Sequence, residues 1–373
     1  MTADAETAGP PAAGAAVLDL GDIRITDSYR VGPKVARLGH LAAAGWPVPD
    51  GYAVTADALG RWLPAAARAE LARLFAVPSD APDTLHRLSV LAQGIIESHP
   101  LPPWLAEAVE QAHERLRQRT GRGQRLRVAV RSSAISEDGA SASFAGQYAT
   151  FLGVGDVADV LRRIRECWAS GFTAHALHYR RRAGDDQLHA HDLAVGVLEL
   201  VDVRSAGVVF TLDPVTGDRE RMVVEANWGF GESVVSGQVT PDQWVVDKAS
   251  GRVLERTVGA KQVWSAFDPA AGGVVLAPLP ADLAARPCLD DDEVRYLCAK
   301  AAEIEAQEGV PQDVEWAIAR DTPLPASVFI LQYRPETAWA TAPDPDPAPA
   351  PAPGKAFDPV QYALRHVFKV PGR

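Results

Sequence analysis

The sequence predicts an α/β protein built from two lobes with a cleft between them. Before about residue 192 the apolar side chains recur mainly at helical spacing, and from Leu193 onward short strand-like runs dominate. A long helix and a hairpin follow near the carboxyl end, and no internal repeat is evident. We expect a disordered start over residues 1–16, an amino-terminal lobe over 17–192, a carboxyl-terminal lobe over 193–340, and a Pro-rich linker with a tail helix over 341–373.

The amino-terminal lobe is expected to be mostly helical. Val35, Leu38 and Leu41 lie at helical spacing, and Gly45 and Pro47 follow as helix-ending residues. Thr55 has the chemistry of a helix cap. The expected elements are a helix over 33–44, a strand over 52–54, helices to about 118, strands over 126–132 and 147–154, and two helical pieces within 156–182.

The carboxyl-terminal lobe is expected to contain a mostly antiparallel sheet. Its strand-like runs alternate or are apolar throughout, and turn residues separate them. The expected elements are strands over 193–201, 206–212, 221–226, 243–247 and 253–258, a helix over 290–308, and a hairpin over 313–319 and 328–334. Residues 357–370 have the pattern of one amphipathic helix.

Composition excludes several classes of partner. The 373 residues are 47% hydrophobic and 23% charged, which is typical of a soluble globular protein. A net charge of -11 argues against nucleic acid or an anionic membrane as the main partner. No apolar run approaches the ~20 residues that span a bilayer, and the first residues lack the basic start of a signal peptide. Three cysteines without a CxxC pair indicate reduced thiols, so we expect a cytoplasmic protein.

A loop led by Arg131 has the character of a phosphate-binding segment. It follows an apolar run at 126–130, so the arginine emerges at the end of a buried strand. Nearly all residues from there to Gln147 are small or acidic, and such backbone can approach an anion closely. A surface loop with an ordinary charge is the alternative interpretation.

Lys34 is a second candidate cation. The chain has 31 arginines and 6 lysines, and Lys34 is the only lysine before Lys248. A lysine retained against this bias indicates that a compact ammonium group is needed there. Survival of a surface lysine by chance is the alternative.

The carboxyl-terminal hairpin brings four polar groups to one face. If the strands pair in register about a turn near Pro323 and Leu324, Glu315 faces Gln332 and Asp313 faces Arg334. Side chains two apart along a strand share a face. A carboxylate and an amide oxygen suit Mg²⁺, and the arginine offers a fork for phosphate oxygens. A solvent-facing cross-strand ion pair is the alternative.

These segments resemble the phosphoenolpyruvate synthase and pyruvate phosphate dikinase family. The run from Arg131 to Gln147 is similar to the signature Val-Arg-Ser-Ser-Ala…Ala-Ser-Phe-Ala-Gly-Gln of that family. Further matches lie before this run at 34–55 and after it at 206–217, 228–242, 311–318 and 330–337. They occur in the family's order, so the resemblance covers about residues 31–337. It identifies the amino-terminal ATP-grasp unit of the family and implies an α+β fold of two lobes that hold a nucleotide between them.

The resemblance implies ATP and Mg²⁺ as ligands and assigns residues to them. Catalytic cations are implied at Lys34, Arg131 and Arg334, and metal ligands at Glu315 and Gln332. Contacts with the nucleotide are implied at Lys34, Arg131, Gly146, Gln147, Thr150, Glu199, Val201, Asp313 and Arg334. The chain departs from the family at Pro33, where glycine is usual, and at Leu198 and Glu199 in the hinge.

The resemblance further implies a dikinase-type phosphotransferase subunit. ATP would be cleaved to AMP and phosphate, and a histidine on a separate partner subunit would be phosphorylated. Two-component relatives, the phenylphosphate and 4-methylphenyl phosphate synthases, suggest a phenol or cresol as final acceptor. His175 is the closest match to the family's phosphorylated histidine, but it lacks the preceding glycine pair and falls in a helical run; His189 and His191 are expected in an exposed loop. The alternatives are a split phosphoenolpyruvate synthase, an antibiotic phosphotransferase subunit, or a nucleotide-sensing module without catalysis.

Overall fold

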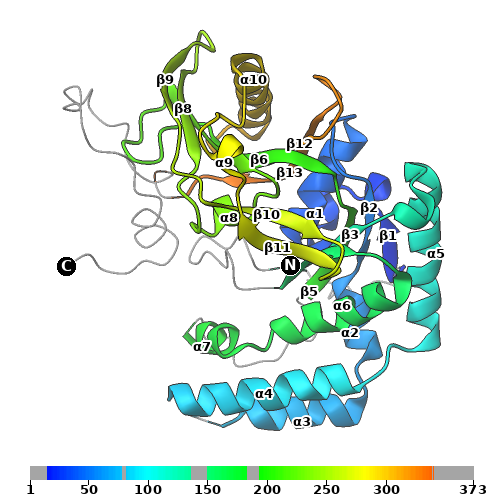
Figure 1. The fold of residues 1–373 in the computed structure, drawn as a ribbon. Coiled ribbons are helices and arrows are strands. Elements are labelled where there is room, and N and C mark those ends of the chain that lie inside the picture. Colours follow the sequence, from blue (N-terminus) through cyan, green and yellow to red (C-terminus); the bar gives the residue numbers. More distant parts are fainter. Residues whose placement is uncertain (1–14, 78–80, 136–148, 183–192, 338, 340–373) are drawn as a thin grey trace, which may run out of the picture.

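Two antiparallel sheets form the centres of two lobes in this chain. The structure, a computed structural model, describes residues 15–77, 81–135, 149–182, 193–337 and 339. A separate two-stranded hairpin, β10–β11, lies where the two lobes meet (Figure 1). The predicted α+β fold of two lobes is therefore confirmed.

The amino-terminal lobe is a five-stranded sheet in the order β1-β2-β5-β3-β4. Every neighbouring pair in it is antiparallel. Its strands are β1 Val17–Asp19, β2 Gly51–Val54, β3 Val128–Ala134, β4 Thr150–Val154 and β5 Leu193–Glu199. Its helices are α1 Ser28–Ala43, α2 Ala56–Trp62, α3 Ala65–Phe75, α4 Pro82–Ser98, α5 Pro103–Thr120, α6 Val157–Ser170 and α7 Ala174–Arg182, with short 3-10 turns at Leu20–Asp22, Ile25–Asp27 and Gly123–Arg125.

The carboxyl-terminal lobe is a six-stranded antiparallel sheet in the order β13-β12-β6-β7-β8-β9. Its strands are β6 Val203–Phe210, β7 Arg221–Trp228, β8 Asp242–Asp247, β9 Val253–Thr257, β12 Gln312–Ala319 and β13 Val328–Pro335. The hairpin strands are β10 Val263–Asp268 and β11 Gly273–Pro278, and the helices are α8 Glu232–Val235, α9 Ala281–Ala284 and α10 Asp291–Glu308. Asp290 caps the start of α10, and its carboxylate accepts hydrogen bonds from the N–H groups of Asp292 and Glu293.

The predicted boundary between the lobes at residues 192 and 193 is wrong by one strand. Strand β5 pairs with β2 and β3, so it belongs to the amino-terminal sheet, and the chain crosses to the second lobe after Glu199. The change to strand-like sequence at Leu193 is real. It does not reveal which sheet a strand joins, because that depends on partners distant in sequence.

Helix α1 lies between the two sheets and packs on both. Val35 belongs to the apolar cluster on one face of the amino-terminal sheet, whereas Leu41 belongs to the core of the carboxyl-terminal lobe. The chain after the helix is also attached to that lobe, because the N–H of Ile330 in β13 donates to Pro47 O at 2.8 Å. The helix that carries Lys34 is thus held by both lobes.

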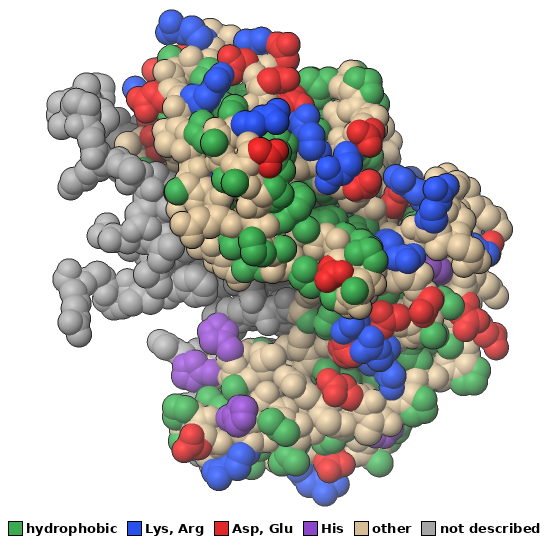
Figure 2. All heavy atoms as spheres, viewed as in Figure 1, with side chains coloured by type: hydrophobic (Ala, Val, Ile, Leu, Met, Phe, Trp, Pro, Cys, Tyr) green, Lys and Arg blue, Asp and Glu red, His purple; other side chains and the backbone are tan. Residues whose placement is uncertain are grey.

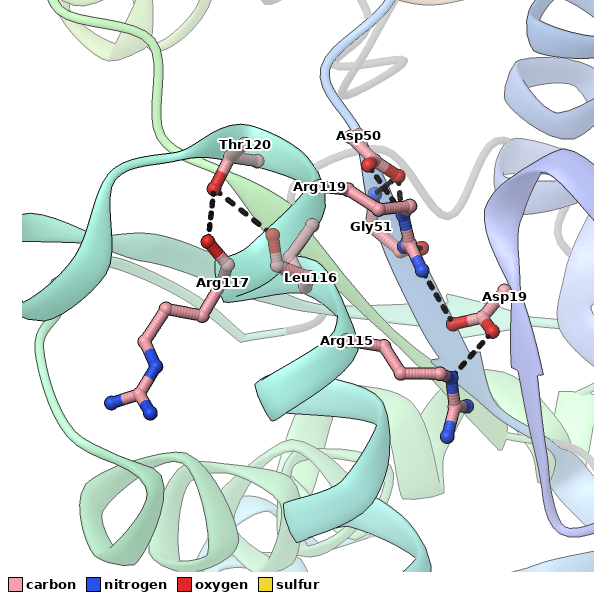
Figure 3. A network of polar contacts seen from close by, with 8 residues as sticks. All are labelled: Asp19, Asp50, Gly51, Arg115, Leu116, Arg117, Arg119 and Thr120. Carbon is pink, nitrogen blue, oxygen red and sulfur yellow. Dashed lines mark hydrogen bonds and ion pairs between the residues drawn. The ribbon is translucent and has the colours of Figure 1, made fainter.

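The carboxyl-terminal end of α5 is tied to β1 and β2 by a charged network (Figure 3). Arg119 donates to both carboxylate oxygens of Asp50, at 2.7 and 3.0 Å, and Arg115 donates to Asp19 at 2.9 Å. The same Asp50 accepts the N–H of Glu199 through its backbone oxygen at 2.7 Å. This network braces the point at which the chain leaves the first lobe.

Several predictions concern residues outside the described ranges. They are the linker and tail helix over 341–373, most of the start over 1–16, Gly146, Gln147, His189 and His191. Within the described ranges, Cys167, Cys288 and Cys298 are buried free thiols. No helix of the described part is long and apolar enough to cross a membrane.

Candidate nucleotide and metal site

Lys34 stands in the first turn of a helix that restarts at a glycine. Gly32 has φ 74° and ψ 156°, which breaks α1, and the regular helix continues from Pro33. Proline is well suited to a first helical position, because the N–H that it lacks would have no partner within the helix. The departure from the family at Pro33 therefore removes a donor without weakening the helix.

The restart of the helix rests directly on β3. A Cβ built on Gly32 would lie 2.2 Å from Ser133 Oγ and 2.8 Å from Ser133 O, so only glycine allows this approach. Ser133 is two residues beyond Arg131 on the same strand, and side chains two apart share a face. The close approach therefore brings the turn with Lys34 to the face of the sheet that carries Arg131.

Arg131 reaches from the amino-terminal sheet to the second lobe. Its Nη2 donates to Oε1 of Gln332 on β13 in a short hydrogen bond. Gly196 lies opposite Arg131 on β5, and a Cβ there would be 3.7 Å from Arg131 Cγ, so the side chain lies on the face covered by α1. Thr150 is paired with Arg131 on β4 and is exposed on the same face. The structure thus brings the predicted residues Arg131, Thr150 and Gln332 together.

The predicted register of the carboxyl-terminal hairpin is confirmed. Glu315 pairs with Gln332 and Asp313 pairs with Arg334, and a bulge after Glu315 shifts the later pairs by one residue. Val314 and Trp316 point to the opposite face, into the core under α10. All four polar groups therefore share one face, and Arg131 contacts that face.

Asp313 and Arg334 form a partly buried ion pair at the edge of this face. Arg334 Nε donates to Asp313 Oδ2 at 3.1 Å, and the side chains are 37% and 10% exposed respectively. Burial raises the pKa of Asp313 to about 6, although Arg334 opposes that shift, and Glu336 and Glu315 add to it. Asp313 Oδ1 is buried without a hydrogen-bond partner among the described residues. A cationic ligand or a hydroxyl donor at this oxygen would relieve that cost.

The donor set fits one hard cation that is shared with a ligand. Glu315 supplies a carboxylate and Gln332 an amide oxygen from facing strand positions, and such oxygens suit Mg²⁺ when phosphate and water complete its shell. Across the described residues, no three His, Cys, Asp or Glu side chains gather as an all-protein metal site. Glu315 and Gln332 thus offer two oxygen ligands, and phosphate and water oxygens could complete the shell of such a cation.

An apolar floor lies on the same face of the sheet, nearer the crossing between the lobes. Val201, Val203, Ala206 and Ala317 form one buried cluster, with Phe230, Ala319, Phe329 and Leu331 packed against it. The four central side chains are at most 5% exposed, so this cluster is a buried apolar patch beside the polar groups of the same face. Val201, predicted at the hinge, lies in this cluster.

The side chain of Glu199 does not join the others. It accepts from Arg122 Nε at 2.8 Å and is only 14% exposed. Val195 and Val197 of β5 face the core of the first lobe, and by alternation Glu199 points to that side, away from Arg131. Any contact with the nucleotide at this position would therefore use the backbone.

Two further carboxyl groups near this face were not predicted from the sequence. Glu225 on β7 faces Val208, which faces Glu315, so all three side chains share the face. Glu225 is 5% exposed, burial raises its pKa to about 7, and it accepts from Gln243 Nε2 at 3.3 Å. Glu232 opens α8 at an exposed position, and desolvation of its carboxyl group raises its pKa. Their placement depends on strand pairing, and no local motif indicates it.

A pocket of about 470 Å³ lies elsewhere, around the start of α10. Its lining includes Arg204 and Arg256, which pair there with Glu293 and Asp291. Helix α10 packs on the face of the sheet opposite Glu315. This pocket is therefore separate from the site described above.

The chain has an ATP-grasp fold of two lobes, each built on an antiparallel sheet. Arg131 of the first lobe meets the carboxylate–amide pair of the second, which gives a candidate phosphate and metal site at the junction. The chain belongs to the family described as "Pyruvate phosphate dikinase, AMP/ATP-binding domain", whose model matches residues 28–350.

Similar proteins include enzymes with different named activities. A probable phosphoenolpyruvate synthase of Staphylothermus marinus is 38% identical over 344 residues, covering 86% of this chain and 41% of that protein. The rifampicin phosphotransferase of a Streptomyces species is 37% identical, with 89% and 37% covered. The prodigiosin-synthesizing transferase PigC of Serratia marcescens is 36% identical, with 87% and 33% covered. The chain spans less than half the length of these relatives.

Proposed function

We propose that this chain binds ATP-Mg²⁺ and transfers a phosphoryl group from it to a histidine on a partner subunit, with release of AMP and phosphate. The observation that carries the proposal is the contact between Arg131 and Gln332. It joins a cation of one lobe to the carboxylate–amide pair of the other, and phosphoryl transfer needs both kinds of group around the phosphates.

The chain's own residues would bind and orient the nucleotide. The purine would lie on the apolar floor of Val201, Ala206 and Ala317. Lys34, Arg131 and Arg334 would contact phosphate oxygens and stabilise the charge that develops during transfer. Glu315 and Gln332 would hold Mg²⁺, which supplies charge neutralisation of the phosphates when bound.

Formation of AMP defines which bonds change. The histidine nitrogen of the partner attacks the β-phosphorus, and the bond from that phosphorus to the α,β-bridging oxygen breaks, so AMP leaves with the bridging oxygen. Water then attacks the γ-phosphorus, which releases phosphate and leaves the β-phosphoryl group on the histidine. Among the described residues, the nearest sequence match to such a histidine, His175, is exposed on α7, and α7 packs on α4. His175 also lacks the preceding glycine pair, and the proposal therefore assigns the phosphorylated histidine to the partner subunit.

The final acceptor is proposed to be a small hydroxyl compound, with a phenol or cresol as the first candidate. The named relatives make pyruvate and a rifamycin the second candidates. A nucleotide-sensing module without catalysis is the competing function from another class. Joint placement of Arg131, Glu315 and Gln332 supports catalysis, because a sensor needs affinity alone.

Acceptor identity can be tested with the chain and the histidine protein that copurifies with it. The pair is incubated with ATP and Mg²⁺ and with phenol, 4-cresol, pyruvate or rifampicin in turn, and phosphorylated products are separated by mass spectrometry. Aryl phosphate with release of AMP supports the first candidate. Phosphoenolpyruvate or phosphorylated rifampicin as the product would make pyruvate or a rifamycin the acceptor in place of a phenol. Nucleotide binding without any formation of AMP would favour the sensor.

A further inference from the structure

The β10–β11 hairpin is anchored to the nucleotide face of the second lobe. The N–H of Phe230 donates to Ser265 O at 2.9 Å, and Asn227 Nδ2 donates to Val263 O at 2.9 Å. Gly229, at φ 74°, lets the two backbones meet, since a Cβ there would lie 2.2 Å from Ser265 O. The base of the hairpin is therefore fixed to the end of β7, beside the apolar floor that includes Phe230.

The far end of the same hairpin rests on the first lobe. A Cβ on Gly153 of β4 would lie 2.8 Å from Cε2 of Phe267 and 3.0 Å from Cα of Gly273. A Cβ on Gly273 would in turn lie 3.2 Å from Leu152 O. Gly153 and Gly273 therefore allow β4 and the hairpin tip to pack directly against each other, with no room for a larger side chain at either position. Figure 1 shows the hairpin where the two lobes meet.

Strand β4 transmits this contact to the candidate site. Thr150 of β4 is paired with Arg131, and Arg131 reaches Gln332 on the second lobe. The β3–β4 pair is therefore held against the second lobe at two places, by the arginine and by the hairpin. A shift of β4 relative to the hairpin would move Arg131 relative to the Glu315–Gln332 pair.

We propose that Phe267 is a positioning residue, whose ring on Gly153 sets the separation of the lobes at which Arg131 meets the Glu315–Gln332 pair. The inference rests on the proposed function. Phe267 remains 37% exposed, so burial in a core does not account for it. Hydrophobic side chains gather on the visible surface where the hairpin crosses between the lobes (Figure 2).

The lobe separation can be measured without catalysis. Glu110 on α5 and Gln307 on α10 are exposed, and the three native cysteines are buried, so Glu110→Cys and Gln307→Cys accept spin labels selectively. Distances between the labels are measured by pulsed electron spin resonance in the full chain, with and without ATP-Mg²⁺. We expect one narrow distribution in the parent and in the control Leu276→Ala, which removes an aliphatic side chain that is 50% exposed on the same hairpin.

Phe267→Ala should broaden that distribution and weaken ATP binding and AMP formation by roughly 10- to 100-fold, the scale of a misplacement near 1 Å. Phe267→Leu, which keeps apolar bulk, should restore most of both. Gly153→Ala should also widen the lobes, and Phe267→Ala in that background should recover part of the loss, because the colliding ring is gone. Circular dichroism and the melting temperature identify variants that fail to fold. If Phe267→Ala is one of them, Phe267→Leu is compared with the parent in its place.

Unchanged distances and unchanged ATP affinity in Phe267→Ala would overturn the inference, as would a double variant no better than Gly153→Ala. A chain that forms no AMP with any partner would overturn the proposed function instead. In that case the distance measurements would still decide whether Phe267 positions the lobes.

Discussion

An alanine at position 32 would collide with β3 at the point where the helix of Lys34 restarts. Its Cβ would lie 2.2 Å from Ser133 Oγ and 2.8 Å from Ser133 O. Rotation of the serine can relieve the first contact, but the backbone oxygen cannot yield in that way, so the helix start must move by about 0.5–1 Å. A displacement of this size between binding groups costs about 10- to 100-fold in affinity or rate.

Gly45 provides a matched control for this substitution. It has φ 78°, close to the 74° of Gly32, but a Cβ there would meet nothing within 4 Å. Both alanine variants carry the strain of a positive φ, about 1–2 kcal/mol in the left-handed region and about 1–3 kcal/mol at Gly32, whose ψ of 156° is almost restricted to glycine. Only Gly32→Ala adds the collision. ATP-Mg²⁺ affinity by isothermal titration calorimetry and melting temperature should be measured for both.

We expect both variants to have a lower melting temperature than the parent, and only Gly32→Ala to lose about 10- to 100-fold in ATP affinity. The collision moves the turn that carries Lys34, whereas the strain at Gly45 lies at the other end of α1. Equal ATP affinities in the two variants would refute the reasoning that the approach of Gly32 to Ser133 positions Lys34.

Arg131→Ala and Arg334→Ala should each lower AMP formation by about 10²-fold or more in a coupled assay, the scale for loss of one preorganised charge donor, and near-normal turnover in either would remove that residue from the site. Glu315→Gln should raise the Mg²⁺ concentration required for activity, and a titration curve that matches the parent would leave Glu315 without a metal role. Burial raises the pKa of Glu225 to about 7 from an ordinary 4.5, so its contribution to stability is full below pH 4.5 and is lost as the pH rises through 7. The free energy of unfolding in urea should therefore be higher for Glu225→Gln than for the parent, by a difference that grows to about 3 kcal/mol between pH 5 and 8. The same pH dependence in both proteins would contradict a buried carboxyl group with a raised pKa.

The pairing of Glu315 with Gln332 could be predicted because a hairpin needs only local information. Two apolar runs and the Pro–Leu turn between them determine which residues face each other. The bulge after Glu315 was not predicted, and it alters only the pairs nearer the turn. Counted from the turn, the pairs before the bulge are one residue away from the predicted register, and the extra residue Leu331 in β13 brings the four polar groups into the predicted pairs.

Contacts between distant segments could not be predicted in the same way. The assignment of β5 to the first sheet depends on β2 and β3, and the sequence of residues 193–199 is equally suited to either lobe. The β10–β11 hairpin has apolar residues on both faces because both of its ends contact other elements, so it lacks the alternation that marks a surface hairpin. The face that Glu225 and Glu315 share is likewise a product of strand order.

The bond of ATP that is cleaved tests the central claim most directly. The full chain, mixed with the histidine protein that copurifies with it, is given Mg²⁺ and ATP labelled with ³²P at the β- or the γ-position, and the nucleotides and the protein are separated. The proposed function predicts AMP as the nucleotide product, β-label on the partner in acid-labile form, and γ-label in free phosphate. Steady formation of ADP, with the γ-label as the only label transferred, would contradict it.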